Sequence, residues 1–263
     1  AARALTAAVF ADTRYDAEIW YRLGAVAERA GDEGMALAAY DRGAARDASA
    51  PWTEGAHRAA LVAERQRDWT RVVVRLAPLL VMATDRDLGR PIQTLQPGGA
   101  IWQGSFLALG EAREQLGQWS EAEAVYARLA AITTPRRDWT WNRTLVGLAR
   151  VRLRRGAATE ALAPIAAALD TASHLEPEVR PRFERDTADT AIRVLDAIRP
   201  VDVSGATAGL PDDAGAWFLR GYAAERVCDW AAARAAYATA AARAGRGAGA
   251  YLNGRPVVGA CPR

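Results

Sequence analysis

Hydrophobic and polar positions follow a helical period in the stretch from Trp20 to Gly43. Two alanine-rich amphipathic segments are separated there by Gly31 and Asp32, a pair typical of a tight turn. Large and small side chains recur along this stretch at Trp20, Leu23, Gly24, Ala27, Ala36 and Tyr40. The pattern predicts two antiparallel helices, in which small residues allow a close crossing and aromatic rings fill the gaps.

The same order of positions occurs twice more with clear matches and twice with weaker ones. The clear copies contain Phe106, Leu109, Gly110, Gly117, Ala122 and Tyr126, and then Trp217, Gly221, Cys228, Ala233 and Tyr237. The weaker copies place Ala60, Val72 and Leu76, and then Ala149, Gly156, Ala161 and Ile165, at the equivalent positions. Each weaker copy has a proline in its second helix, at Pro78 or Pro164, which removes a backbone donor and predicts a bend.

These offsets resemble those of the tetratricopeptide repeat, a helix-turn-helix unit of about 34 residues, here in a degenerate bacterial form. The resemblance implies an all-α fold, a right-handed superhelix (α-solenoid) of five or six stacked antiparallel helix pairs. We expect this single solenoid to cover residues 1–245 and to be followed by a non-helical tail at 246–263.

The spacing of the matched small residues locates the irregular parts of the chain. Gly24, Ala60, Gly110, Ala149 and Gly221 are separated by 36, 50, 39 and 72 residues. The second interval contains a segment rich in Gly, Pro and Gln, which predicts a loop insertion at about 85–101. The last interval predicts an aberrant unit at about 176–212, with one long helix and no second one. Residues 1–16 resemble the end of a second helix, so we expect a partner, a missing segment or a self-contact to cover this apolar end.

Composition excludes several kinds of chemistry. All 34 basic residues are arginines, so the chain cannot form a lysine Schiff base or supply the lysine of a phosphate-binding loop. The two histidines, His57 and His174, are too far apart for a metal motif with close ligand spacing. The best candidate for a membrane span, residues 72–82, is short and contains Arg75, so we expect no membrane-spanning helix. We predict no catalytic residue, no cofactor and no metal.

The only two cysteines are Cys228 and Cys261. The tail before Cys261 is long enough to reach the turn that contains Cys228, because an extended chain spans about 3.3 Å per residue. A disulfide between them is our prediction, with two free thiols as the alternative. A disulfide would indicate an oxidising compartment such as a periplasm.

One segment is strongly basic, with seven arginines opposed locally only by Asp138: Arg136, Arg137, Arg143, Arg150, Arg152, Arg154 and Arg155. A solvated helix face is one interpretation, and a patch for an anion or an acidic partner is the other. Trp139 and Trp141 lie within the segment and would permit stacking on nucleic acid, although tryptophans in this repeat type commonly serve packing.

The first helices line the concave groove in tetratricopeptide repeat proteins. The resemblance therefore implies a partner-binding surface that comprises Glu18, Tyr21, Glu28, Glu54, His57, Leu61, Glu64, Leu107, Glu111, Arg143, Val146, Arg150, Phe218, Tyr222 and Glu225. For His57 in particular, a structural role is an alternative to contact with a ligand. A lysine and asparagine clamp, which related chaperone-tail receptors use, is absent because Tyr21 and Ala25 occupy the corresponding positions.

We predict a non-enzymatic scaffold or assembly subunit of a bacterial multiprotein complex, which binds a protein partner through the concave helix surface. The location expected by resemblance is the periplasm or cell envelope, with the cytoplasm as the alternative. A second hypothesis is a regulatory or enzyme-accessory module that binds nucleic acid or an acidic partner through the Arg136–Arg155 segment. A third, a catalyst in residues 176–213, lacks a visible nucleophile and base.

Overall fold

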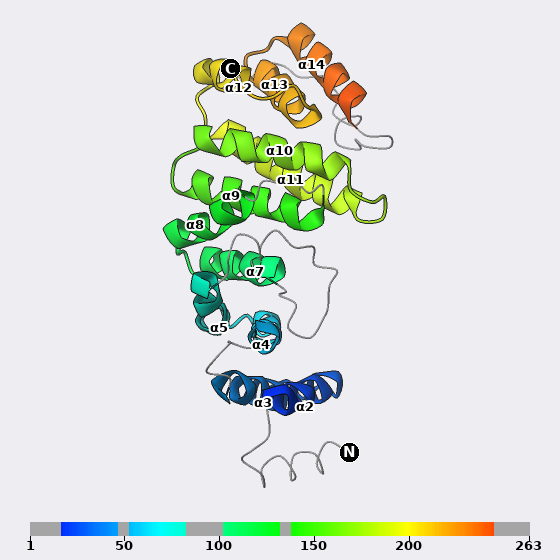
Figure 1. The fold of residues 1–263 in the computed structure, drawn as a ribbon. Helices are drawn as coiled ribbons and strands as arrows, with labels where there is room; N and C mark the ends of the chain where they lie inside the picture. The colour runs from blue at the N-terminus through cyan, green and yellow to red at the C-terminus, as the bar shows by residue number, and fades with distance from the viewer. Residues whose placement is uncertain (1–16, 47–52, 83–101, 132–137, 245–263) are drawn as a thin grey trace. The chain divides into compact units, whose positions relative to one another are not determined.

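The computed structural model of the protein describes residues 17–46, 53–82, 102–131 and 138–244. Every regular element in these residues is a helix (Figure 1). The elements are α2 (Ala17–Arg29), α3 (Glu33–Arg46), α4 (Thr53–Arg65), α5 (Trp69–Met82), α7 (Trp102–Gln115), α8 (Trp119–Ala130), α9 (Trp139–Arg154), η1 (Thr159–Ala161), α10 (Leu162–Ser173), α11 (Arg180–Asp196), α12 (Pro200–Ala208), α13 (Ala214–Arg226) and α14 (Trp230–Arg243). Within these ranges no helix is long and apolar enough to cross a lipid bilayer.

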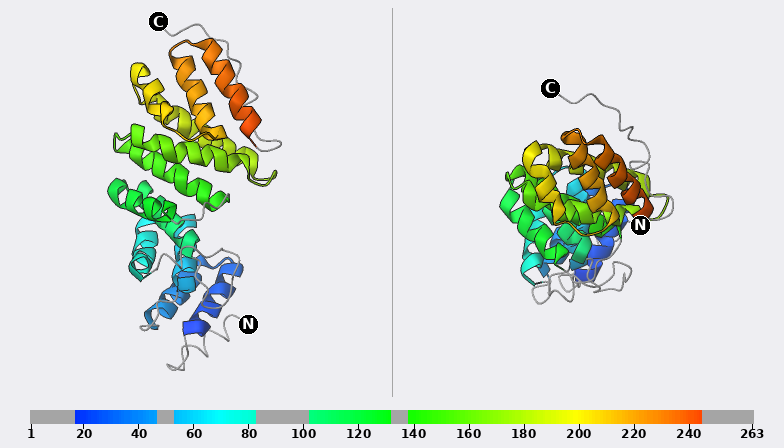
Figure 2. Two further views of the ribbon diagram at one scale, coloured as in Figure 1. Left: turned by 45° about the horizontal axis from the view of Figure 1, so that its top comes forward. Right: turned by 90° about the horizontal axis from the view of Figure 1, so that it is seen from above.

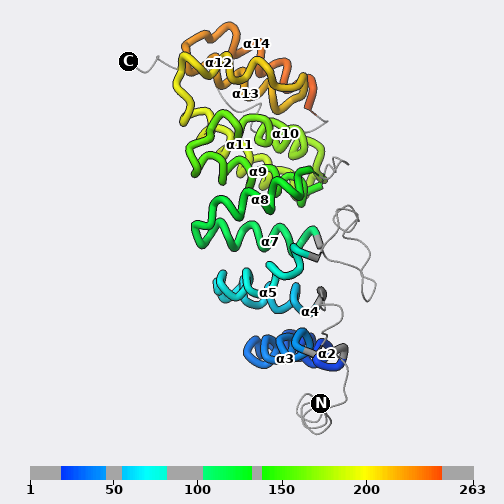
Figure 3. The backbone as a smooth tube through the Cα atoms, turned by 60° about the vertical axis from the view of Figure 1, so that its left-hand side comes forward, coloured from blue at the N-terminus to red at the C-terminus, as the bar shows by residue number. Residues whose placement is uncertain are grey.

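The contacts divide the chain into two compact units, Ala1–Gln118 and Trp119–Arg263. In the N-terminal unit α2 packs on α3, α3 on α4, α4 on α5, and α5 on α7. In the C-terminal unit α8 packs on α9, α9 on α10, and α13 on α14. Figures 2 and 3 show this succession of neighbouring helices within each unit. Residues 1–16, the insertion at about 85–101 and the tail at 246–263 lie outside the described ranges.

One type of turn ends the first helix of each predicted pair. In each of the five turns one residue has a left-handed backbone, with φ between 57° and 80°: Gly31, Arg67, Gly117, Gly156 and Cys228. The amide of the next residue donates back across the turn, as from Asp32 to the Ala27 carbonyl at 2.9 Å. This bond satisfies a carbonyl at the helix end. These five residues are spaced by the same 36, 50, 39 and 72 residues as the small positions, which confirms the repeat register.

The second helix of each pair contributes the same two buried positions. Ala36, Val72, Ala122, Ala161 and Ala233 are all fully buried. Tyr40, Leu76, Tyr126, Ile165 and Tyr237, which lie four residues later, are also buried. The hydrophobic pattern therefore identified the core-facing side of these helices correctly, in the weak copies as well as the clear ones.

Glycine on one helix is matched to tyrosine on the next. A Cβ atom on Gly24 would lie 2.4 Å from Cε1 of Tyr40, and one on Gly221 would lie 2.6 Å from Cε1 of Tyr237. Both distances are far below an ordinary contact, so these rings fit only against glycine. The two weak copies instead have alanine opposite Leu76 or Ile165, and these smaller side chains leave room for the alanine methyl group.

The aberrant unit differs from our prediction in one respect. The long helix is present as α11, but the prediction that no second helix follows is wrong, because Pro200–Ala208 forms α12. Its sequence, PVDVSGATA, contains glycine and β-branched or hydroxyl side chains that lower helix propensity. Pro200 occupies the first helical position, where its fixed φ favours the start of a helix. The low helix propensity of the residues that follow explains why the sequence did not predict α12.

The last helix pair packs on three earlier helices of the same unit. α13 packs on the short α12, on α11 and also directly on α10. The crossing with α10 is close because Gly215 has no side chain: a Cβ there would lie 2.0 Å from the carbonyl oxygen of Ala166. This contact accounts for the irregular last interval, since the stack continues from α10 to α13 although a shortened unit intervenes in sequence.

Pro164 has a different effect from the one predicted. The second helix of this pair begins as the 3-10 turn η1, and Pro164 follows in the first turn of α10. Amides in a first turn have no helical carbonyl partner, so proline removes no helical hydrogen bond there. Pro78 lies inside α5, as predicted.

Candidate functional site

Five of the predicted groove residues are buried. His57, Leu107, Val146, Phe218 and Tyr222 have between 1% and 8% of their surface exposed. The expectation that they face a partner is therefore wrong. Phe218 packs 5.7 Å from the ring of Tyr237, and Tyr222 donates to Asp196 at 3.0 Å, so both serve the interior of the C-terminal unit.

His57 links two helices of the N-terminal unit. Its Nδ1 lies 2.9 Å from the Ser105 hydroxyl, which comes from α7. Burial, with a smaller contribution from the positive charge of the nearby Arg58, lowers the pKa of His57 to about 4. The imidazole is consequently neutral at physiological pH. The structural interpretation of His57 is supported.

The other predicted groove residues with described side chains are partly exposed. They are Tyr21, Glu28, Leu61, Glu64, Glu111, Arg143, Arg150 and Glu225. The side chains of Glu18 and Glu54 lie outside the described set. The candidate surface is thus discontinuous: apart from Tyr21 and Leu61, the aromatic and aliphatic positions are buried, and the accessible positions are charged.

An ion-pair network ties together the first two helix pairs. Glu28 on α2 accepts from the Tyr40 hydroxyl at 2.8 Å and from Arg65 at 2.9 Å. Arg65, at the end of α4, also donates to Glu33 at 3.0 Å, and Glu33 accepts from Gln66 at 2.9 Å. Burial raises the pKa of Tyr40, and the Glu28 carboxylate adds to this effect. Glu28 therefore has a structural role in addition to any contact with a partner.

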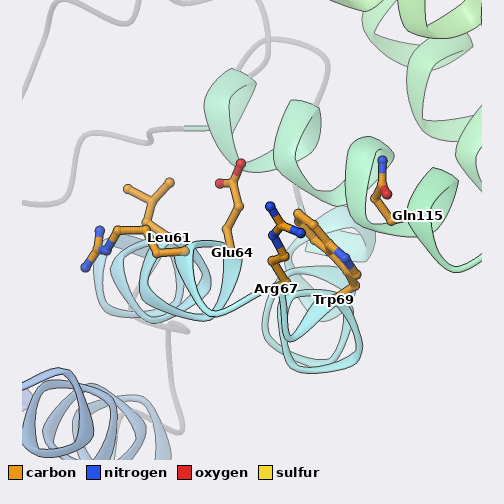
Figure 4. A pocket seen from close by; sticks show the side chains of 6 residues that line it. Leu61, Glu64, Arg67, Trp69 and Gln115 are labelled. Atoms are coloured by element: carbon orange, nitrogen blue, oxygen red, sulfur yellow. The ribbon is translucent and has the colours of Figure 1, made fainter.

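A hollow of about 630 Å³ lies in the N-terminal unit, between residues of α4, α5 and α7. It is lined by Leu61, Glu64, Arg65, Arg67, Trp69 and Gln115. These residues come from the end of α4, the following turn, the start of α5 and the end of α7 (Figure 4). The lining mixes an aliphatic, an aromatic, an amide and charges of both signs, which suits a polar or charged side chain of another molecule.

Sequence reasoning found only part of this hollow. Leu61 and Glu64 were predicted as groove residues and Trp69 as part of a turn, whereas Arg65, Arg67 and Gln115 were not predicted as site residues. A comparison of equivalent repeat positions would have found Gln115, because it occupies the place that Arg65 has one repeat earlier.

The basic segment does not form one patch in the described residues. Arg152 and Arg155 both bind Glu123 of α8, with a distance of 3.0 Å for Arg152. Burial raises the pKa of Glu123, but the hydrogen bonds from the two arginines outweigh it and the net pKa is lowered. Arg143 lies over the Trp139 ring, at 5.9 Å from its centroid. Arg136 and Arg137 lie outside the described ranges.

The remaining chemistry at the described positions is sparse. No cluster of three or more metal-ligating side chains occurs there. Cys228 has the left-handed conformation at the turn between α13 and α14, with φ of 64°. Cys261 lies outside the described ranges, so the disulfide between these two residues stays a prediction.

Comparison with known proteins supports the fold. No protein-family model and no curated protein matches the sequence. Among solved structures, a tetratricopeptide repeat protein from Parabacteroides merdae ATCC 43184 is similar, with a TM-score of 0.51 and 14% sequence identity. The match covers 92% of this chain and 85% of that one. The chain therefore has the α-solenoid fold of tetratricopeptide repeat proteins, as its repeated offsets predict.

Proposed function

We propose that this protein is a non-enzymatic interaction scaffold, which binds a protein partner along the first helices of its pairs. Stacked helix pairs present extended contact surface, and proteins with this fold typically bind other proteins. The observation that carries the proposal is the hollow in the N-terminal unit. It combines two predicted groove residues, Leu61 and Glu64, with the partly exposed side chain of Trp69.

Aromatic side chains with charged neighbours are a recurrent feature of protein-binding hot spots. Trp69 supplies a large apolar surface beside the charges of Glu64 and Arg67, within a concave site. Elsewhere in the described residues five predicted groove side chains, His57, Leu107, Val146, Phe218 and Tyr222, are buried and unavailable for contact. The hollow is accordingly the best place to begin a search for the partner.

Site-specific photocrosslinking tests this proposal in the organism that encodes the protein. A photoreactive amino acid replaces Leu61 in one variant and Val74, a 61% exposed residue on the outer side of α5, in a matched control. We expect a defined adduct from position 61 and none from position 74. The partner, identified by mass spectrometry and purified, should then bind the wild-type protein in solution. Adducts from both positions alike would contradict binding through the first helices.

We further propose that the complex is bacterial and belongs to the periplasm or cell envelope, with a Cys228–Cys261 disulfide. The resemblance to bacterial tetratricopeptide repeat proteins and the even number of cysteines support this proposal. Alkylation before and after reduction, followed by intact-mass analysis, tests the disulfide. Two alkylated thiols in the unreduced native protein would contradict it.

The second candidate, binding of nucleic acid or an acidic partner through the Arg136–Arg155 segment, has weaker support. Glu123 neutralises part of the charge of Arg152 and Arg155. Nucleic-acid binding predicts an affinity that falls steeply with salt. Filter binding of single-stranded DNA at low and high salt would detect it.

A further inference from the structure

The ion-pair network of the first two helix pairs has an incomplete copy one repeat later. With Gly24, Ala60 and Gly110 aligned, Glu64 takes the place of Glu28 and Gln115 takes the place of Arg65. In the first site Arg65 bonds both Glu28 and Glu33. In the second site the carboxylate is kept, but an amide without a positive charge replaces the guanidinium.

The other two partners of the network have also changed. Tyr40, whose hydroxyl donates to Glu28, corresponds to Leu76, which has no hydroxyl group. Glu33, the second acceptor for Arg65, corresponds to Trp69. The hollow lies at this second site, with Glu64, Trp69 and Gln115 in its lining (Figure 4). By the alignment of the repeats, these lining residues are the equivalents of the residues that Arg65 joins one repeat earlier.

We propose that the hollow receives an arginine side chain from a protein partner, in the role that Arg65 has within the chain itself. The Glu64 carboxylate supplies a charge-assisted hydrogen bond, and the Trp69 ring supplies a face for stacking of the guanidinium. Arginine suits both contacts, because its planar group forms hydrogen bonds at its edge while its face lies on an aromatic ring. This inference rests on the proposed partner-binding function and specifies the chemistry of the partner.

Arg67 allows a test of whether the hollow binds a positively or a negatively charged side chain. Arg65, the other cation in the lining, is already paired with Glu28 and Glu33, whereas Arg67 is exposed and has no ion pair with Glu64 among the described contacts. Its positive charge opposes entry of another cation, so the substitution Arg67→Gln should strengthen binding of an arginine probe. A site for an acidic side chain would respond in the opposite direction.

The probe is Nα-acetyl-arginine amide, titrated into the full-length protein while the indole N–H resonance of Trp69 is followed by NMR. Trp69→Phe identifies that resonance among the nine tryptophans. A single side chain should bind with a Kd on the order of 1–10 mM. Nα-acetyl-citrulline amide is the matched control, because it has nearly the same shape without the charge. We expect a saturable shift with the arginine compound and at least fivefold weaker binding of the citrulline compound.

Two variants of the protein complete the test. Glu64→Gln should weaken binding of the arginine probe at least fivefold with little change in fold. Gln115→Arg restores the residue type found one repeat earlier, so it should fill the hollow from within and abolish the shift. Equal binding of arginine and citrulline compounds, preference for Nα-acetyl-glutamate amide, or unchanged binding by Glu64→Gln would each overturn the inference. None of these results depends on the photocrosslinking experiment, so the two proposals can fail separately.

Discussion

The substitution Gly215→Ala tests how the last helix pair is joined to the rest of the C-terminal unit. Gly215 lies in the first turn of α13, where this helix crosses α10. The added Cβ atom would lie 2.0 Å from the carbonyl oxygen of Ala166 and 2.9 Å from Cβ of Leu169. A carbonyl oxygen within a helix cannot rotate away as a flexible side chain can. The two helices must therefore separate.

The expected cost follows from two opposing effects. Overpacking a well-packed site typically costs about 1–3 kcal/mol, and occasionally more. Replacing glycine by alanine in a helix contributes at most about 1 kcal/mol in the opposite direction. Because the contact is with backbone, we expect the upper end of the cost and a net loss of about 2 kcal/mol in the free energy of unfolding. At about 2–4 °C per kcal/mol for a chain of this size, Tm should fall by roughly 4–8 °C.

Gly205→Ala is the matched control within the same unit. Gly205 is an exposed residue inside α12, and a Cβ atom there would meet nothing within 4 Å. Alanine should stabilise this helix by about 0.5–1 kcal/mol through its higher propensity. Thermal and urea unfolding, followed by far-UV circular dichroism, would measure both variants. If Gly215→Ala proved as stable as Gly205→Ala, the close approach of α13 to α10 would be refuted.

Three further predictions concern other contacts. Gly24→Ala should destabilise the protein by about 1 kcal/mol, because an overpacking cost of about 2 kcal/mol exceeds the gain in helix propensity of about 1 kcal/mol. Adding Tyr40→Leu should suppress this loss, because the double variant recreates the alanine–leucine pair of the next repeat. A double-mutant cycle that showed no coupling between the two positions would contradict the fit of the ring against glycine. His57 stays neutral in the folded state down to a pKa of about 4, whereas the unfolded chain takes up a proton near pH 6.5. Stability is therefore lost as pH falls from 7 to 5, by about 2 kcal/mol for this group, and His57→Gln should remove that part of the pH dependence in urea titrations. Glu123→Gln should lower the free energy of unfolding by about 1 kcal/mol in dilute buffer and by less in 1 M NaCl, where ion pairs are screened; an equal loss at both salt concentrations would argue against an ionic role.

Short-range sequence signals determined the repeat and its register. The turn positions, the small positions and the aromatic positions all depend on neighbours within one helix pair. Gly24 and Tyr40, for example, are only 16 residues apart and meet through helix geometry alone. Such local constraints survive even in the weak copies, because Ala60 with Leu76 satisfies the same packing requirement with different volumes. The helical class and the five turns could therefore be predicted.

Tertiary structure decided which predicted groove residues are accessible. A helical face is defined by sequence, but its burial depends on how closely the next pair packs against it, and this spacing varies along an irregular repeat. Phe218 and Tyr222 became interior residues of the C-terminal unit, because Phe218 packs against Tyr237 of α14 and Tyr222 donates to Asp196 of α11. Leu61 and Glu64 stayed accessible where Gln115 replaces the arginine that fills the equivalent space one repeat earlier. The candidate site thus results from contacts between successive pairs, whose geometry no single helix specifies.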